Sequence, residues 1–462
     1  TGISVRNDYG NAIVSDQFGN VFVSGTFGQQ IILGNCSAIA DSTGGYRSSF
    51  VAKINNNGSC QWISTISKHS KHINSVNNGI ALDSDGSIYV TGGTSSGPGD
   101  VMFNSTNSSK LMNIGGGFGS TYLAKLNSLG EWDWVYSHGS YYDGTLAALD
   151  IDQQDNIRIG SIYQTGNSRY SDIITLNKSG NVISQTNIGG NSAYRGVVIA
   201  DISSSSNGIS VSGSFLGTMK FDINGSEKLI YSPNQATYFP FALNLDLNDN
   251  VAWVANISSS SSSATGIISS IISDGISTYI TGTAYSDVDF GNHLRTFGGT
   301  QSGFVASIDT NGNWNWINEL SCSGTVESNS LALDSSGNIY VAGSQKSCTL
   351  VLASLSLPQL AGDEDVFIIR MNSSGVPDWA KSAGGGTKDE LASLTLDSDD
   401  NIIVTGFQEG SGMYGAITTP SAGGTDLIIG KLSADFDNDG FPDKNDDDID
   451  GDNLLNYEDL CV

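Results

Sequence analysis

Hydrophobic and polar residues alternate along this chain in a pattern that returns seven times. Each copy is a pair of short alternating segments joined by Asp, Ser, Asn or Gly, as in LALDSSGNIYVAGS from Leu331. A period of two predicts strands with one buried face, and the residues between the segments predict a tight hairpin. A glycine anchors the second segment of every copy, at Gly25, Gly92, Gly160, Gly213, Gly282, Gly343 and Gly406.

A second hairpin follows the first in six of the seven copies. FVAKINNNGSCQWI from Phe50 and FVASIDTNGNWNWI from Phe304 are two examples. Four strands in a unit, repeated in seven units, predict an all-β fold, a seven-bladed β-propeller over residues 1–432. Small sheets arranged radially leave only short, protected edges, so a long all-β chain of this kind avoids edge-to-edge aggregation.

The phrases LDSSGNIYVAG and FVASIDTNGNWNWI resemble the seven-bladed β-propeller repeat family of bacterial and archaeal secreted and surface proteins. The resemblance covers about residues 1–432 and implies a structural or binding role outside the cell. Units three and four depart from the pattern, with RIG at Arg158 and a serine-rich turn at 203–206. These departures leave the strand limits of the two units open and do not change the number of blades.

Tryptophan recurs at one place in these units. All seven Trp residues fall in the last predicted strand of a unit: Trp62, Trp132, Trp134, Trp253, Trp314, Trp316 and Trp379. Recurrence at one register predicts packing between blades in preference to a sugar-binding platform. Asp83, Asp334 and Asp397 end the first strand of their units, where we expect them to cap the following turn.

The seventh unit stops before its fourth strand. Its last strand-like segment is DLIIGKLS from Asp426, and comparison with the other units places the missing strand just before Thr1. Residues 426–433 then form an open edge that the acidic tail, an upstream segment or a neighbouring subunit completes. Completion by a neighbouring subunit would build a filament. The other interpretation is a three-stranded blade covered by the tail.

Residues 433–462 form a second, strongly acidic region with two copies of a calcium-loop spacing. Oxygen ligands at positions 1, 3, 5, 7, 9 and 12 wrap a hard cation, with a backbone carbonyl at position 7. The first loop offers Asp435, Asp437, Asp439, Phe441, Asp443 and Asp446. The second loop offers Asp448, Asp450, Asp452, Leu454, Asn456 and Asp459. Position 6 requires a residue that tolerates positive φ, and Gly440 and Asn453 stand there.

The composition of these loops favours Ca²⁺. Neither loop contains His or Cys, which disfavours zinc and copper, and the number of oxygen ligands favours Ca²⁺ over Mg²⁺. The segment resembles thrombospondin type 3 and dockerin-like calcium repeats, which implies an extracellular protein. Asp instead of Glu at position 12 predicts an affinity suited to millimolar calcium. Without the metal we expect the tail to be disordered, because binding and folding are coupled here.

Charge and hydropathy limit the partners. The chain has 20 Lys and Arg against 47 Asp and Glu, a net charge of −27. With no clustered basic segment, nucleic acid is not an expected partner. No apolar run reaches the length of a membrane span, so membrane insertion is not expected either. The chain begins at Thr1, which fits a mature secreted product and equally a trimmed form.

The five cysteines show no zinc spacing. Cys36 with Cys60, and Cys322 with Cys348, form two sequence-local pairs. The pairs suggest two disulfides made in an oxidising compartment, and the alternative is free buried thiols. Cys461 is left without a pair in either case.

Sequence motifs for catalysis are weak. Gly93 to Gly97 matches GxSxG, but Pro98 follows where a helix must begin, and His69 and His72 lack a third metal ligand. We therefore expect no enzyme, but a secreted or cell-surface, calcium-stabilised structural or adhesive module. Its expected partners are other surface proteins, copies of itself in an extracellular filament, or glycans. The alternative is a lectin-like carbohydrate-binding module, and a polysaccharide hydrolase or lyase is less favoured.

Overall fold

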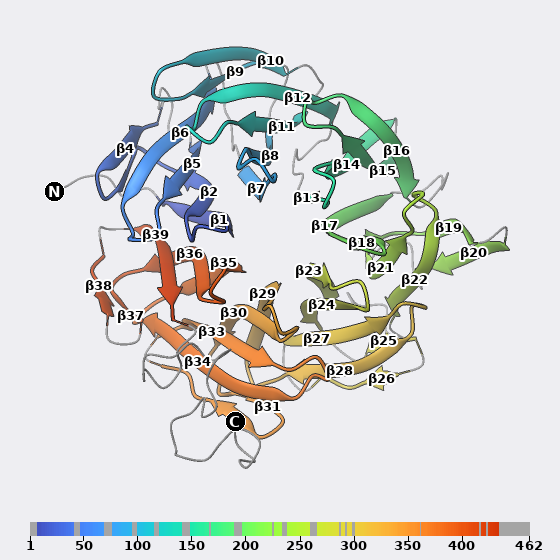
Figure 1. Ribbon diagram of the computed structural model, residues 1–462. Helices are drawn as coiled ribbons and strands as arrows, with labels where there is room; N and C mark the ends of the chain where they lie inside the picture. The colour runs from blue at the N-terminus through green and yellow to red at the C-terminus, as the bar shows by residue number, and fades with distance from the viewer. Residues whose placement is uncertain are drawn as a thin grey trace.

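The computed structural model describes residues 7–433 with sixteen short gaps. The gaps are 41–46, 69–75, 95–98, 115–119, 141–147, 166–167, 189–195, 224–225, 233–237, 259–265, 286–287, 292, 298–300, 361, 415–416 and 422–423. Within the described residues every regular element is a β-strand. Seven sheets stand around a common centre as blades, which confirms the seven-bladed β-propeller (Figure 1).

Blades one to six each contain four strands that run outward from the centre in chain order. Blade one has β1 (Tyr9–Ser15), β2 (Val21–Phe27), β5 (Ser48–Ile54) and β6 (Cys60–Lys68). Blade two has β7 (Val76–Leu82), β8 (Ile88–Thr94), β11 (Ser120–Leu126) and β12 (Trp132–Ser140). Blade three has β13 (Leu149–Ile151), β14 (Ile157–Thr165), β15 (Ser168–Leu176) and β16 (Val182–Ile188).

The second half of the ring follows the same order. Blade four has β17 (Val197–Ser205), β18 (Gly208–Phe215), β21 (Phe239–Leu245) and β22 (Val251–Ser258). Blade five has β23 (Gly266–Ser273), β24 (Ser277–Ala284), β27 (Ser302–Asp309) and β28 (Trp314–Leu320). Blade six has β29 (Thr325–Leu333), β30 (Ile339–Lys346), β33 (Glu364–Met371) and β34 (Pro377–Gly385). Blade seven has β35 (Asp389–Leu396), β36 (Ile402–Glu409) and β39 (Thr425–Leu432).

Six blades carry an extra hairpin between their second and third strands, which the sequence analysis did not predict. These insertion hairpins are β3 (Gln30–Leu33) with β4 (Cys36–Ile39), β9 (Gly99–Asn104) with β10 (Ser109–Ile114), β19 (Thr218–Ile223) with β20 (Ser226–Tyr231), β25 (Val288–Phe290) with β26 (Leu294–Arg295), β31 (Leu350–Leu352) with β32 (Leu355–Leu357), and β37 (Gly412–Tyr414) with β38 (Ile417–Thr419). Three of them extend the preceding blade at its outer edge: β9 pairs with β6, β25 with β22 and β37 with β34.

Each blade is packed between two neighbours, so its middle strands are buried on both faces. Every residue of β33 (EDVFIIRM) is buried, and so is every residue of β21. Phe367 and Ile369 of β33 pack in one core cluster with Tyr279 and Val305 of blade five. Burial on both faces explains why these strands have continuous apolar runs instead of strict alternation.

The recurring glycines mark where the inner strand approaches the second strand most closely. A Cβ on Gly343 would stand 2.0 Å from the carbonyl oxygen of Glu327. The inner strand bulges at this place, between Ser328 and Ser330. Similar close contacts to an inner-strand carbonyl oxygen occur at Gly25, Gly213, Gly282 and Gly406. Only a residue without a side chain fits opposite such a bulge.

The turn and disulfide predictions are confirmed. Asp83 Oδ1 accepts hydrogen bonds from the N–H groups of Asp85 and Ser87, and Asp334 and Asp397 cap their turns in the same way. Disulfides join Cys36 to Cys60 and Cys322 to Cys348. Among the described residues, no helix has the length and hydropathy to cross a membrane.

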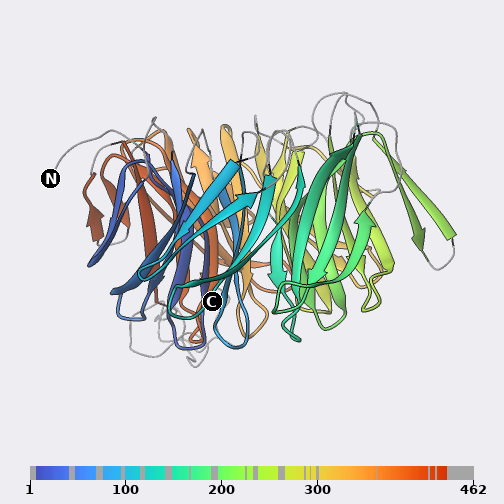
Figure 2. The same ribbon diagram turned by 90° about the horizontal axis from the view of Figure 1, so that it is seen from above.

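The ring closes directly between blades seven and one. The Asp8 N–H donates to the Thr425 carbonyl oxygen at 2.8 Å, and Ser15 Oγ donates to the Leu396 carbonyl oxygen at 2.7 Å. An equivalent bond joins blades five and six, where the Val326 N–H donates to the Gln301 carbonyl oxygen at 2.9 Å. Seen edge-on, the blades form one disc whose strands run between its two faces (Figure 2).

Candidate functional site

The most distinctive feature of this propeller is the outer edge of blade seven. Its sheet has three strands in the described part of the chain, in the order β35, β36, β39, which confirms the prediction that its fourth strand is missing there. Thr405 Oγ1 donates to the Ile428 carbonyl oxygen, so the backbone polar groups of Ile428 point toward β36. Because these groups alternate along a strand, those of Leu427, Ile429 and Lys431 point to the open edge.

Two cavities flank this edge. One of about 1010 Å³ lies between β39, the β3 hairpin strand of blade one and the outer strands β34 and β38 attached to blade six. Its lining is largely apolar and includes Ile31, Leu33, Ala380 and Leu427. The other, of about 430 Å³, lies between Ile429–Lys431 and the blade-one turn Asn55–Gly58. We call the two cavities together with the edge of β39 the blade-seven groove.

The charged groups of the groove are held by partners. Lys431 Nζ lies 2.6 Å from Asp397 Oδ2. Burial acts to raise the pKa of Asp397, but Lys431 and Asn401 outweigh it and hold this pKa below its usual value. Burial raises the pKa of Asp8 to about 6, although its carboxylate accepts the Gly28 N–H. The groove therefore presents an apolar surface and backbone groups more than an exposed charge.

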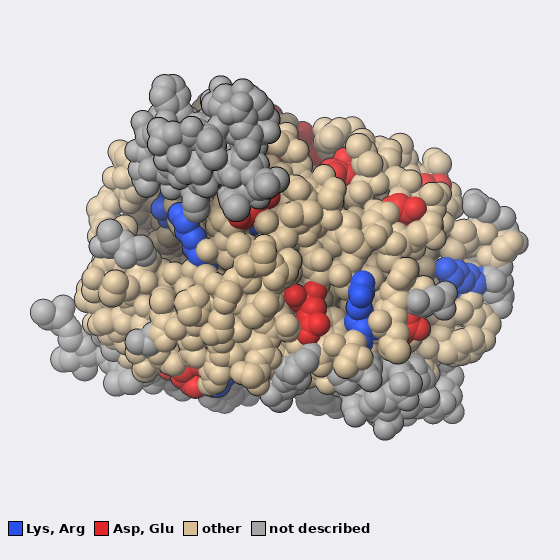
Figure 3. All heavy atoms as spheres, turned by 90° about the horizontal axis from the view of Figure 1, so that it is seen from below, with Lys and Arg blue, Asp and Glu red and all other residues tan. Residues whose placement is uncertain are grey.

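On the face of the molecule shown in Figure 3, charged side chains stand singly among uncharged ones in the part of the chain that is described. The described part of this face therefore presents mainly uncharged residues.

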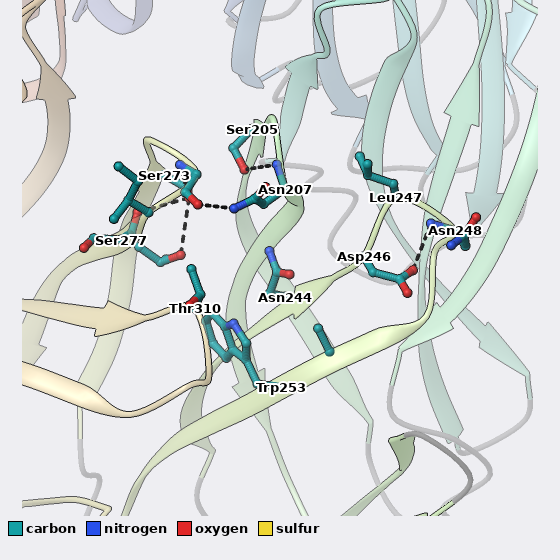
Figure 4. A pocket seen from close by; sticks show the side chains of 14 residues that line it. Ser205, Asn207, Asn244, Asp246, Leu247, Asn248, Trp253, Ser273, Ser277 and Thr310 are labelled. Carbon is teal, nitrogen blue, oxygen red and sulfur yellow. Dashed lines mark hydrogen bonds between the residues drawn. The ribbon is translucent and has the colours of Figure 1, made fainter.

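A second, more polar pocket of about 400 Å³ lies between blades four and five (Figure 4). Asn244, Trp253 and Thr310 contribute to its wall. Asp246, also in the wall, already accepts hydrogen bonds from the N–H groups of Asn248 and Asn250 at 2.8 and 2.9 Å. The Asp246 carboxylate in the pocket wall therefore already caps the adjoining turn.

The tryptophans pack between blades, as predicted. The Trp62 ring covers Gly130 of the next blade, where a Cβ would stand 2.5 Å from the ring, and Trp62 Nε1 donates to the Ser128 carbonyl oxygen at 3.3 Å. The same Trp-on-Gly contact joins Trp134 to Gly180, Trp253 to Gly312 and Trp316 to Gly375. Each glycine has positive φ and ends the hairpin turn between the third and fourth strands.

Near the groove, two buried carboxyl groups approach each other. Asp365 and Asp389 are fully buried, and a Cβ on Gly384 would stand 2.5 Å from Asp365 Oδ1 and 3.0 Å from Asp389 Oδ2. Burial, and then the nearby Asp365, raise the pKa of Asp389 to about 6, although the Gly385 N–H donates to it at 2.6 Å. At pH 7 this pair therefore opposes folding.

We expect Asp389→Asn to flatten the pH dependence of stability. Because the folded-state pKa is raised from 3.8 to about 6, the native state binds more protons in this window and stability falls as pH rises through it. The contribution of Asp389 is at most about 3 kcal/mol. The fall in the free energy of unfolding from pH 4 to pH 7, measured by urea unfolding, should be smaller for Asp389→Asn than for the exposed Asp133→Asn. An equal fall in the two variants would contradict the raised pKa of Asp389.

The twelve predicted calcium ligands between Asp435 and Asp459 lie outside the described residues. So do Cys461 and the residues of the two motifs rejected above, His69 with His72 and Ser95. Among the residues that are described, no group of three or more His, Cys, Asp or Glu is placed to hold a metal ion.

One element of the candidate site was not predicted from the sequence, the β3–β4 hairpin, whose strand β3 lines the groove. Its signal was present: the alternating segments QIIL and CSAI are joined by Gly34 and Asn35, and Gly34 has positive φ. The hairpin was missed because it lies inside a unit and does not recur with one sequence.

Comparison with known proteins supports the propeller prediction. A family model described as "Beta-propeller repeat" matches residues 315–344, which include Trp316 and Gly343. No curated protein shows significant similarity to the chain.

Several solved structures are similar in part. A protein of unknown function from Bacteroides caccae is 12% identical, with 78% of this chain and 79% of that chain covered and a TM-score of 0.29. A eukaryotic initiation factor is 8% identical, with 83% and 93% covered and a TM-score of 0.31. A glycosyl hydrolase from Bacteroides ovatus is 10% identical, with 66% and 84% covered and a TM-score of 0.23. Similarities at this level carry no argument about function.

Proposed function

We propose that this chain is a non-enzymatic, extracellular structural or adhesive module, stabilised by calcium, that assembles with other surface proteins or with copies of itself. The observation that carries the proposal is the open edge of β39 between two cavities. Edges of this kind bind further strands through backbone hydrogen bonds. The two disulfides support an oxidising compartment, and the acidic tail supports a calcium-rich one.

Edge blocking tests this role. Ile429→Pro removes an N–H that points to the open edge and leaves the hydrogen bonds to β36 in place, because proline is tolerated on an edge strand. We expect assembly of the purified protein, or its capture of a surface partner, to be lost in this variant while the circular dichroism spectrum is unchanged. The matched control is Leu294→Ser on the edge strand β26, where the side chain is exposed and lies away from the groove. Equal assembly of Ile429→Pro and the wild type would contradict the proposed role.

Calcium binding to the tail is a separate prediction. We expect two Ca²⁺ ions per chain, one for each loop, and Asp439→Asn with Asp452→Asn to abolish both, because each removes a carboxylate from position 5. Calorimetric titration measures the number of ions. EDTA should leave the propeller's far-ultraviolet spectrum and unfolding midpoint nearly unchanged. Unfolding of the whole chain by EDTA would show that the metal lies elsewhere.

Carbohydrate binding is a second candidate, which only the polar pocket of Figure 4 favours. If this pocket binds glycans, a glycan array at saturating calcium should give signals that Asn244→Ala and Thr310→Ala reduce together. An unchanged array would remove the lectin-like alternative.

A further inference from the structure

Carboxyl groups recur at equivalent places on both sides of blade seven. We call a joint the contact between the third strand of one blade and the inner strand of the next. Two positions before the residue that pairs with the recurring glycine, the third strand has Asp365 in blade six and Asp426 in blade seven. At the same distance before its own glycine partner, the facing inner strand has Asp389 in blade seven and Asp8 in blade one. Each joint of blade seven therefore contains a pair of carboxyl groups.

The equivalent positions of three other joints are uncharged. Both positions are described between blades three and four, four and five, and five and six. They are Ser171 with Val197, Phe239 with Gly266, and Ser302 with Val326. The first of these pairs shows that the two positions meet, because Ser171 Oγ donates to the Val197 carbonyl oxygen at 2.6 Å. A carboxyl pair on each side therefore distinguishes blade seven from these joints.

The pair between blades six and seven lies inside the protein. Asp365 and Asp389 are fully buried, and a Cβ on Gly384 would stand within 3.0 Å of a carboxyl oxygen of each. Asp365 Oδ1 and Asp389 Oδ1 have no hydrogen-bond partner among the described residues. Two ionised carboxylates so placed repel each other more strongly than in water, because the interior has a low dielectric constant. A proton on either carboxyl group removes this repulsion.

The charged groups around this buried pair do not neutralise it. Glu409 of β36 adds a further negative charge beside the pair. Burial, and then the two carboxylates of the pair, raise the pKa of Tyr414 on β37, so its hydroxyl stays neutral. Lys388 lies at the start of β35, but its Nζ is 3.0 Å from Glu390 and 3.6 Å from Glu364. The positive charge of this lysine is therefore already held by two glutamates.

The pair between blades seven and one is half-buried. Asp8 and Asp426 both line the larger cavity of the groove. Burial is the main cause that raises the pKa of Asp8 to about 6 and Asp426 adds to it, whereas the Gly28 N–H and Arg47 act to lower this pKa. The backbone N–H of Asp8 donates to the Thr425 carbonyl oxygen at 2.8 Å. A charge on the Asp8 carboxyl group therefore lies at a contact that closes the ring.

We propose that the two carboxyl pairs control the attachment of blade seven to its neighbours: each joint is closed while its pair retains a proton and loosens when both carboxyl groups ionise. As the pH rises, blade seven then opens locally while the other blades stay packed. Its described sheet has only three strands, and small packed units open more easily than the rest of a fold. The opening includes β39, but the inference does not depend on the proposed assembly function, because it concerns the isolated chain.

Proton binding favours the closed joints at low pH. Asp389 and Asp8 each have a pKa raised from 3.8 to about 6 in the folded protein. The closed state therefore binds more protons than an open state in which these groups titrate normally. The stabilisation is complete below about pH 4 and is lost as the pH rises through 6. From pH 5 to pH 8 the equilibrium constant for opening should rise about tenfold for each joint.

Hydrogen exchange measured by mass spectrometry tests this opening in the full chain, with EDTA present so that calcium in the tail does not contribute. Exchange rates divided by the intrinsic rate at each pH give the protection of each strand. We expect the protection of β35 and β39 to fall at least tenfold from pH 5 to pH 8, and that of β27 in blade five to change less than about threefold. An equal change in all three strands, or no fall in β35 and β39, would overturn the proposal.

The double variant Asp389→Asn with Asp8→Asn tests the two pairs, because asparagine has the shape of a protonated aspartate and carries no charge. We expect β35 and β39 of this variant to keep their pH 5 protection at pH 8 within about threefold. Retention of the wild-type fall would mean that other groups control the joints, and would overturn the proposal.

Asp201→Asn is the matched control. Burial also raises the pKa of Asp201 to about 6, but its carboxylate accepts the Ile271 N–H between blades four and five. We expect the pH dependence of β35 and β39 to be unchanged in this variant. If Asp201→Asn abolishes the fall in protection as the double variant does, the pH effect is global, and the assignment to the joints of blade seven is overturned.

Discussion

Replacing Gly343 by alanine should lower the free energy of unfolding by about 3 kcal/mol or more. The new Cβ would stand 2.0 Å from the backbone oxygen of Glu327 and 2.7 Å from the ring of Phe367. Neither neighbour can move aside easily, because the oxygen belongs to the inner strand and the ring is fully buried. The backbone of the bulge must shift instead, and the packing of blade six shifts with it.

The control for Gly343 is its neighbour in the same hairpin, Gly337. Gly337→Asn places a Cβ in open space at a positive φ that asparagine tolerates, so we expect a loss below about 1 kcal/mol. Equilibrium unfolding in urea measures both variants. Comparable losses would show that the close contact at Gly343 does not determine the position of the inner strand.

Trp62→Ala has the second large expected effect, a loss of about 3 to 5 kcal/mol of unfolding free energy. The Trp62 side chain is only 9% exposed, its ring covers Gly130, and its indole N–H is bonded to the Ser128 carbonyl oxygen. Removal leaves a cavity between blades one and two and breaks this hydrogen bond. The neighbouring blade cannot fill the space, because Gly130 has no side chain.

Trp62→Phe separates packing from hydrogen bonding at this joint. Phenylalanine retains most of the ring, so Trp62→Phe should recover more than half of the unfolding free energy that Trp62→Ala loses. Phe18→Ala is the surface control, since Phe18 is 68% exposed, and should change stability by less than about 0.5 kcal/mol. A small effect of Trp62→Ala would mean that the Trp-on-Gly contact does not hold the blades together.

Residue types and their spacing along the chain were sufficient to predict the strands and turns that recur in each blade. The recurrence of two strand-like segments with turn residues between them identified the strands around Gly343, and the Asp334 turn is capped as its residue types predict. The tryptophan positions followed from their register alone. These features could be predicted because neighbouring residues in the chain determine a hairpin, and the same hairpin occurs in every blade.

Of the candidate site, the sequence predicted the edge strand and did not predict the walls beside it. The missing strand of blade seven could be counted from the repeats, and β39 was expected to be an edge. The β3–β4 wall and the smaller cavity beside the Asn55–Gly58 turn could not be predicted in this way, because both depend on which blade follows which around the ring.

By itself the sequence determined the number of blades, the turns, the place of each tryptophan and the blade that lacks a strand, because local residue types and their recurrence decide these features. Only the tertiary structure decided that three of the insertion hairpins join the preceding blades, and that β3 and the Asn55–Gly58 turn of blade one line the groove along β39. Ring closure brings Gly58 beside Lys431, residues near opposite ends of the chain, and no local pattern specifies contacts of that separation.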